Sequence, residues 1–297
     1  FSAQLHAPRR TTADGFTLGL SLLLIGLFEK IVLADSVFAP VADPIFKAGA
    51  TIDSAGAWTG TIAFAGQIFC DFAGYSTCAI GCAAMLGFWL PDNFRSPYAA
   101  TGFSDFWRRW HISLSRWLRD YLYVPLGGNR GSTLFTLRNL MLTMLLGGLW
   151  HGAAWTFVAW GAFHGLMLVV ERMSRPAIDH AGRSLGLIGT LLGGLITLFG
   201  VLIAWVWFRA PDFAHSARIH SAMFLPTDTS ANLSAEAKIA LIVFGLMWSM
   251  HWLSRHHDLR RWLQQRGAVS LGLIWAALIV AIVLSPGVSR AFIYFQF

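Results

Sequence analysis

Long apolar segments dominate this chain and limit what it can fold into. About 20 mostly apolar residues in α-helical form are enough to cross the hydrocarbon core of a bilayer. Candidate spans of this kind are approximately 16–34, 57–90, 134–150, 153–170, 186–208, 238–253 and 268–285. The span 57–90 is long and is interrupted by Asp71 and several glycines, so two shorter pieces are an alternative there. We therefore expect an all-α fold, a polytopic integral membrane helical bundle.

The composition agrees with the membrane class. Hydrophobic residues make up 56% of the chain and charged residues 12%, whereas soluble domains carry about 25% charged residues. The net charge of +7 does not indicate nucleic-acid binding, because the basic residues occur in short segments between apolar runs. Such segments are typical of loops that face the cytoplasm and anionic lipid.

The charges of the loops predict a hairpin in the middle of the chain. The segments around Arg9–Arg10, 91–131, 171–183 and 255–266 are net basic, and basic loops stay on the cytoplasmic side. All four basic segments can lie on the cytoplasmic side only if 134–170 enters and leaves the membrane on the same face. The turn of this hairpin is then Trp150-His151-Gly152, which places His151 away from the basic loops.

The segment 91–131 differs from the apolar spans because it combines six Arg and three Asp with many aromatic residues. Read as one helix, it has an apolar stripe of Trp107, Trp110, Leu114, Trp117, Leu118 and Tyr121. The other face carries Arg108, Arg109, Arg116, Arg119 and Asp120, with His111 at the border. This pattern predicts an amphipathic helix in the membrane interface or packed on the bundle, ended by Pro125 and Gly127-Gly128.

Motifs of soluble enzymes are absent: there is no Walker loop, GxGxxG, GxSxG or HExxH sequence. The three cysteines, which lack CxxC spacing, predict neither a disulfide framework nor a metal site. Ionisable residues at membrane depth are therefore the functional candidates, because burying them is costly. They are Asp71, His151 and His164, joined by His111 from the amphipathic segment.

Each candidate also has a structural interpretation. His164 could simply donate a hydrogen bond to a backbone carbonyl of a neighbouring helix. His151 lies between Gly147-Gly148 and Gly152, where the backbone can line a cavity, and a neutral imidazole there can act as a general base. For Asp71 the simplest interpretation is an ion pair with an arginine of 91–131. Physical reasoning from the residues ends at a membrane protein with a polar interior, either an enzyme or a transporter.

Four sequence runs resemble the membrane-bound O-acyltransferase superfamily, and within it the bacterial alginate O-acetyltransferase branch. They are DFAGYSTCAIG, NFRSPY, SDFWRRWHISLSRWLRDYLYVPLGG and NLMLTMLLGGLWHGAAWTFVAWGAFHG, followed by VWFRAPDF and the closing FIYFQF. The resemblance implies one membrane domain over 1–297, built around a central tunnel. Because members of this family are longer at the N-terminus, we expect the domain to lack its N-terminal helices.

The resemblance also implies roles for individual residues. The invariant histidine of the family falls on His151 and its second functional histidine on His111, and these are the expected catalytic residues. The expected substrate-binding residues are Arg108, Arg109, Arg116, Asp71, Trp150 and Asn139. The arginines would hold the phosphates of the acyl donor, although a solvated face or a lipid anchor is the alternative. No metal and no cofactor is expected, only acetyl-CoA or another acyl thioester as co-substrate.

The function implied is transfer of an acetyl group toward hydroxyls of a secreted polysaccharide, such as alginate. The expected partners are membrane lipid, the acyl donor, and the polysaccharide or periplasmic acetyltransferase proteins, with no nucleic acid. The expected location is the bacterial inner membrane, with several membrane passes. Two alternatives stay open: a transporter or channel for an acyl group or ion, and an O-acyltransferase with a lipid, peptidoglycan or protein acceptor.

Overall fold

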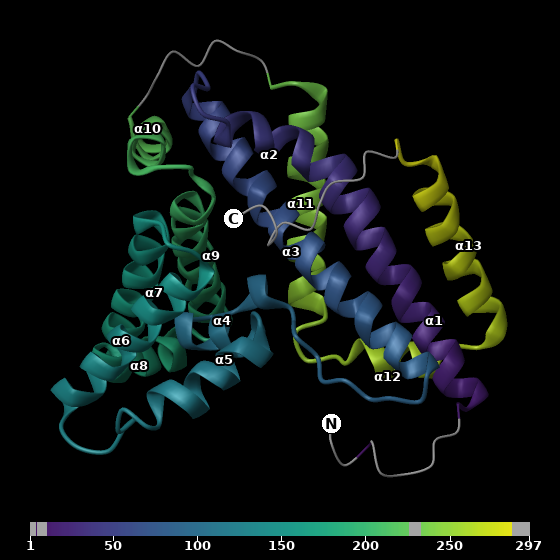
Figure 1. Ribbon diagram of the computed structural model, residues 1–297, viewed down its shortest axis with the longest axis horizontal. Coiled ribbons are helices and arrows are strands. Elements are labelled where there is room, and N and C mark those ends of the chain that lie inside the picture. The colour runs from purple at the N-terminus through teal and green to yellow at the C-terminus, as the bar shows by residue number, and fades with distance from the viewer. Residues whose placement is uncertain (1–3, 5–10, 226–232, 287–297) are drawn as a thin grey trace. The chain divides into compact units, whose positions relative to one another are not determined.

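The computed structural model describes residues 4, 11–225 and 233–286, and these residues are mostly helical and contain no strand (Figure 1). This confirms the expected all-α fold. The helices form two compact units. The first contains described residues of Phe1–Ala42, Ala63–Asn93 and Ala235–Gln296, and the second consists mainly of Asp43–Ile62 and Phe94–Ser234. The expectation of a single domain stays a prediction.

The first unit is built on two long helical stretches. One is continuous over α1 (Ala13–Leu27), the π-helix η2 (Phe28–Phe38) and α2 (Ala39–Phe46), and the other is α3 (Ser54–Met85). Residues of α2 and α3 also belong to the second unit. The remaining helices of the first unit are α11 (Ala235–Leu253), α12 (Leu259–Gln264) and α13 (Ala268–Leu284).

Glycines bring α1 and α3 into close contact. A Cβ atom on Gly19 would lie 2.6 Å from the carbonyl oxygen of Gly81, and one on Gly26 would lie 2.6 Å from that of Gly74. Small residues let helix backbones approach in this way in membrane proteins. The alternative of two pieces in 57–90 is therefore wrong, because α3 runs unbroken through Asp71 and these glycines serve helix packing.

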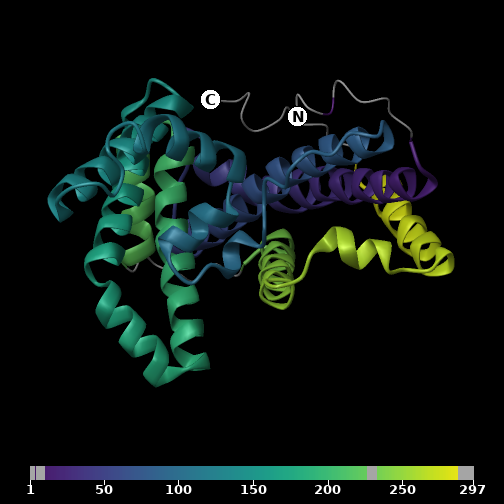
Figure 2. The same ribbon diagram turned by 90° about the horizontal axis from the view of Figure 1, so that it is seen from below.

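The second unit holds the hairpin and the segment that follows residue 91. In chain order it contains η3 (Pro97–Ala99), α4 (Phe103–Arg109), α5 (Ile112–Leu118), the π-helix η4 (Arg119–Tyr123), α6 (Thr133–His151), α7 (Trp155–Met173), α8 (Arg175–Leu185), α9 (Leu187–Arg209) and α10 (Phe213–Phe224). The helices α6 and α7 pack along each other, and α9 packs on α7, with α8 joining the ends of α7 and α9 (Figure 2).

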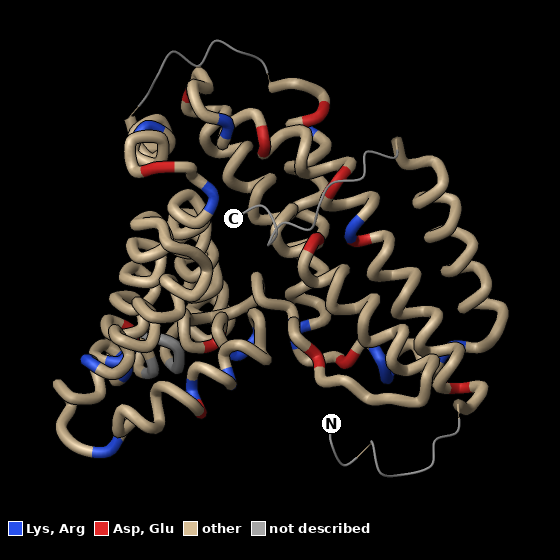
Figure 3. The backbone as a smooth tube through the Cα atoms, in the orientation of Figure 1, with Lys and Arg blue, Asp and Glu red and all other residues tan. Residues whose placement is uncertain are grey.

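Within residues 11–225 and 233–286, three helical stretches are long and apolar enough to cross a membrane: Ala13–Phe46, Ser54–Met85 and Leu187–Arg209. They correspond to three of the predicted spans. Helices α6, α7, α11 and α13 match the bounds of the other four, although they are shorter or less apolar. Arginines lie on α4 (Arg108 and Arg109), on α5 (Arg116) and in the loop before α6 (Arg130), whereas α9 carries no charged residue before Arg209 (Figure 3).

The prediction of one amphipathic helix in 91–131 is wrong. The chain leaves the helical conformation at Trp110 and His111, so α4 and α5 are two separate short helices. Trp110 is consequently buried at 2% exposure, whereas Trp117 and Tyr121 are 51% and 70% exposed. The supposed apolar stripe is thus divided, because the break changes the direction of α5 relative to α4.

Candidate active site

The hairpin of α6 and α7 carries two histidines, and glycines set its geometry. A Cβ on Gly148 would overlap the carbonyl oxygen of Phe157, and one on Gly161 would overlap that of Met144. The two helices therefore touch at these glycines. From the sequence, Gly147-Gly148 are expected where the backbone can line a cavity, but Gly148 is needed for this helix contact.

His151 is the last residue of α6, at the turn of the hairpin as predicted. The N–H of Gly152 donates to the carbonyl of Leu149 (3.2 Å) and closes the helix. A Cβ on Gly152 would lie 2.8 Å from the ring of Phe157, so only glycine fits beside this ring. The tight turn holds the His151 ring against Trp160 and Phe208, with ring centroids 5.1 and 5.0 Å apart.

His111 has an unusual backbone conformation. Its φ of 43° and ψ of 56° lie in the left-handed region, which residues other than Gly, Asn and Asp rarely adopt. It is the N-cap of α5, and its Nδ1 accepts the N–H of Leu114 (3.4 Å). Because Nδ1 accepts, a neutral His111 ring carries its proton on Nε2. Such strained positions cluster at functional sites.

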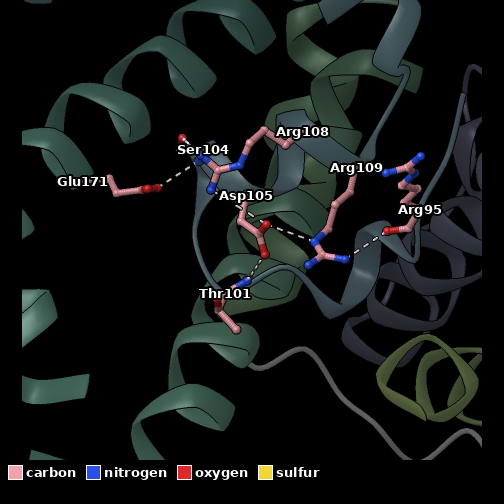
Figure 4. A network of polar contacts seen from close by, with 7 residues as sticks. All are labelled: Arg95, Thr101, Ser104, Asp105, Arg108, Arg109 and Glu171. Carbon is pink, nitrogen blue, oxygen red and sulfur yellow. Dashed lines mark hydrogen bonds and ion pairs between the residues drawn. The ribbon is translucent and has the colours of Figure 1, made fainter. Parts of the chain in front are cut away.

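A polar network fixes the helix that leads to His111 (Figure 4). Asp105 accepts hydrogen bonds from Nε of Arg109 (3.0 Å) and from the backbone N–H of Thr101 (3.2 Å). Glu171 on α7 accepts the backbone N–H of Ser104 (3.0 Å), which belongs to the first turn of α4. Arg109 also donates to the carbonyl of Arg95 (3.2 Å). These bonds tie α4 to α7 and to the preceding loop.

Trp150 brings the two predicted catalytic histidines into one site. Its ring centroid lies 5.1 Å from that of His151 and 6.5 Å from that of His111. Trp150 itself is 57% exposed, whereas both histidines are mostly enclosed. Burial lowers the pKa of His111 to about 4, so this ring is neutral at physiological pH.

His164 lies in the middle of α7, inside a cluster of aromatic rings. Its centroid is 4.9 Å from Trp160 and 5.1 Å from Trp107, and its ring stacks on Phe106 at 6.0 Å. Neither of its ring nitrogens has a hydrogen-bond partner within the described part of the chain. The expected bond from His164 to a backbone carbonyl is therefore absent there, because aromatic rings occupy its surroundings.

The predicted substrate-binding residues fall into different environments. Arg108 is exposed and contacts Ser104 (3.2 Å) and Asp105 (3.8 Å), and Arg116 is exposed on α5. Arg109, in contrast, is engaged in the network around Asp105. The three arginines thus differ in how much of the guanidinium is accessible.

Asn139 and Asp71 are both buried and bonded within the protein. Nδ2 of Asn139 donates to the carbonyl of Gly128 (3.1 Å), which ties the loop before α6 to that helix. The ion pair of Asp71, which lies in the first unit, is with Nζ of Lys30 (2.5 Å), and Lys30 also pairs with Asp35 (2.9 Å). Lys30 is thus one partner of Asp71, because the packing of α3 on the helix of Lys30 brings the two together. An ion pair of Asp71 with an arginine of 91–131 stays a prediction.

The residues that support the histidines are not predicted from the sequence: Trp107 is expected only as part of an apolar stripe, and Trp160 and Glu171 are not singled out. Trp160 and His164 are four residues apart and therefore share one face of α7. No comparable signal predicts Glu171, because its contact with α4 spans 67 residues of sequence.

Comparison with known proteins gives a consistent result. Residues 3–208 match the membrane-bound O-acyltransferase family. A probable alginate O-acetylase of Azotobacter vinelandii is 47% identical over 216 residues, which cover 73% of this chain and 42% of that protein. A peptidoglycan O-acetyltransferase of Helicobacter pylori is 44% identical over 207 residues, covering 69% of this chain and 38% of that protein.

A teichoic acid D-alanyltransferase of Streptococcus thermophilus is 34% identical over 164 residues, covering 50% of this chain and 38% of that protein. The chain thus matches about two fifths of the length of these curated relatives. The matched residues of this chain include the two helices of the hairpin and both of its histidines, since the family match extends to residue 208.

Proposed function

The chain belongs to the membrane-bound O-acyltransferase family, and from this we propose that it forms part of an enzyme that acetylates a secreted polysaccharide. The relatives named for alginate O-acetylation and for peptidoglycan O-acetylation are 47% and 44% identical to it. Both names refer to hydroxyl groups of a polysaccharide, and the proposed acceptor is therefore of this class.

One observation carries the proposal: His111 and His151, from separate helices, both lie against Trp150. Nδ1 of His111 accepts a backbone N–H, and in this proposal its Nε2–H donates to the substrate. His151 is the residue proposed to take the proton from a bound hydroxyl. A donor and a base beside the same aromatic ring suit acyl transfer, which needs both functions.

The proposed reaction has one acyl transfer step. An acceptor hydroxyl loses its proton to His151 while its oxygen attacks the thioester carbonyl, forming the ester C–O bond. The C–S bond then breaks, and the departing sulfur takes the proton back from His151 as a thiol. His111 donates from Nε2 to the carbonyl oxygen, where negative charge develops. General base catalysis is typically worth about 10²–10⁴-fold, and one donor to the developing charge about 10²–10³-fold.

For the acyl donor we propose acetyl-CoA or another acyl thioester. Arg108 and Arg116 are exposed and are the residues proposed to bind its phosphates. Arg109, Asn139 and Asp71 have a structural role in this proposal, because their side chains are bonded within the protein. Trp150 would contact both donor and acceptor.

The proposed setting is a multi-pass protein of the bacterial inner membrane. Three apolar stretches of sufficient length support more than one pass. Periplasmic acetyltransferase proteins are the proposed partners, since the acceptor polysaccharide is secreted and the thioester is cytoplasmic. Alginate and peptidoglycan are alternative acceptors.

The test uses the full-length protein in membranes together with candidate partner proteins. Transfer of radiolabelled acetyl from acetyl-CoA is followed for wild type, His151→Ala and the control His180→Ala, which changes an exposed histidine of α8. We expect transfer to fall at least 10²-fold in His151→Ala only. Full activity in His151→Ala at matched expression would contradict the proposal and favour the transporter alternative.

A further inference from the structure

The imidazole of His164 is fully buried, with 0% exposure, and makes no hydrogen bond to any described residue. Leaving a buried polar group without a partner destabilises a fold, whereas an apolar ring of the same shape would not. Phe106 stacks on one face of the His164 ring, and these aromatic surroundings would suit a phenylalanine at position 164 as well. Packing alone therefore does not explain why this residue carries two ring nitrogens.

Two neighbouring indoles have the same property. Nε1 of Trp107 and Nε1 of Trp160 are buried and also lack a hydrogen-bond partner within the described residues. The three rings touch one another: the centroids are 5.1 Å apart for Trp107 and His164, 4.9 Å for Trp160 and His164, and 5.7 Å for Trp107 and Trp160. Four unsatisfied nitrogens thus belong to one group of three rings.

The donors and acceptors in this group define what could bind. Each indole nitrogen is a donor only, and a neutral imidazole has one donor and one acceptor. The group therefore offers mainly N–H donors, and its natural partner is an uncharged oxygen that accepts them. N–H contacts with aromatic faces would satisfy these groups only weakly. The surrounding phenyl rings of Phe103 and Phe106 disfavour an anion or a metal ion.

We propose that Trp107, Trp160 and His164 form a binding site for one uncharged oxygen atom. Two sources have this chemistry: an internal water, or the carbonyl oxygen of the acyl group. The second source rests on the proposed function, because Trp160 lies between His164 and the proposed base, with its ring at 90° to that of His151. In that case the indole N–H groups add to the stabilisation of the charge that develops on the carbonyl oxygen.

The experiment compares thermal unfolding midpoints of the full-length protein in detergent, alone and with CoA or acetyl-CoA. His164→Phe removes both ring nitrogens and keeps an aromatic ring. The matched control is His220→Phe, because His220 also packs on a tryptophan, Trp207 (4.7 Å), but has a known partner in the carbonyl of Ile203 (3.2 Å). This control calibrates the loss of one hydrogen bond, about 2–4 °C in Tm.

Two results support the site and separate its sources. If the oxygen is an internal water, His164→Phe lowers Tm about as much as His220→Phe, with or without ligand. If it is the acyl carbonyl, His164→Phe leaves the Tm of the free protein unchanged or higher. The additional stabilisation that acetyl-CoA gives over CoA in wild type is then lost in the variant.

One result overturns the proposal: an unchanged or raised Tm together with no change in the difference between acetyl-CoA and CoA. If His164→Phe does not fold, Trp107→Phe is used instead, because it removes one indole N–H and keeps a ring, and the same three outcomes apply. Failure of the proposed function is distinguishable. It would appear as absent acetyl transfer in wild type, whereas the water result needs no transfer at all.

Discussion

The indole of Trp160 stands at 90° to the imidazole of His151, with 5.1 Å between the ring centroids. Trp160 is 2% exposed and lies on α7, whereas His151 ends α6. The orientation of His151 therefore depends on the packing of the neighbouring helix. Edge-to-face aromatic pairs of this kind contribute about 0.5–1.5 kcal/mol beyond the area they bury.

Trp160→Ala is expected to lower the free energy of unfolding by about 3–5 kcal/mol, because it leaves a cavity among buried rings. Transfer of acetyl should fall as well, since His151 loses the ring that orients it. The control is Trp155→Ala on the same helix, at a side chain that is 75% exposed. Chemical unfolding of both variants gives the measurement, and equal losses would contradict this account of Trp160.

Gly148→Ala should separate α6 from α7, because the added Cβ would overlap the carbonyl oxygen of Phe157. We expect a loss of about 1–3 kcal/mol in unfolding free energy. Gly245→Ala on α11 is the matched control, as a Cβ there meets nothing within 4 Å. It should be neutral or stabilising by up to about 1 kcal/mol. An unchanged unfolding free energy in Gly148→Ala would contradict the prediction, because α6 and α7 would then accept the added Cβ without loss of stability.

His111→Asn tests the proposed hydrogen-bond donor without changing the backbone conformation. Asparagine tolerates the left-handed region and can accept the N–H of Leu114 as an N-cap. The fold should therefore be retained within about 1 kcal/mol, while acetyl transfer falls about 10²–10³-fold. His256→Asn is the control, since it makes the same change at an exposed histidine in the turn after α11. Unchanged kcat in His111→Asn would remove His111 from the mechanism.

The stability of the fold should decrease in mild acid because of His111. Its pKa is lowered by burial from 6.5 to about 4, so the unfolded chain takes up a proton before the folded protein does. Stability from this group is complete above pH 6.5 and is lost as the pH falls toward 4, by roughly 3 kcal/mol. The slope between these pH values should be smaller in His111→Gln, measured by denaturant unfolding. An identical slope would mean that another group titrates.

Removing one partner of the ion pair in the first unit should be costly. Nζ of Lys30 lies 2.5 Å from Asp71 and 2.9 Å from Asp35, and both carboxylates are buried. Lys30→Met removes the ammonium group that both carboxylates contact, which costs about 3–5 kcal/mol for a buried pair. Adding Asp71→Asn should restore part of this loss. Lys47→Met, at an exposed lysine, is the control, and additive effects of the first two changes would argue against the pair.

Much of the hairpin could be predicted from the sequence, since apolar length fixed α6 and α7 and Gly152 marked the turn at His151. The break at His111 could not be predicted. The residues 103–123 have a helical apolar period, but the rings of Phe94, Phe106 and Trp205 surround Trp110 within 5.7 Å and hold it in place. Local sequence carries no information on contacts that come from α9.

By itself, the sequence determined the helical class, the apolar stretches and the position of His151 at a helix end. These features depend on residues close together in the chain: apolar length, periodicity and glycine. Only the tertiary structure decided that Lys30 pairs with Asp71, that Trp150 lies against both catalytic candidates, and that the nitrogens of His164 have no hydrogen-bond partner in the described part of the chain. Those contacts depend on which helix faces pack against each other. A periodic pattern specifies that a face is buried, but not which side chains it will meet.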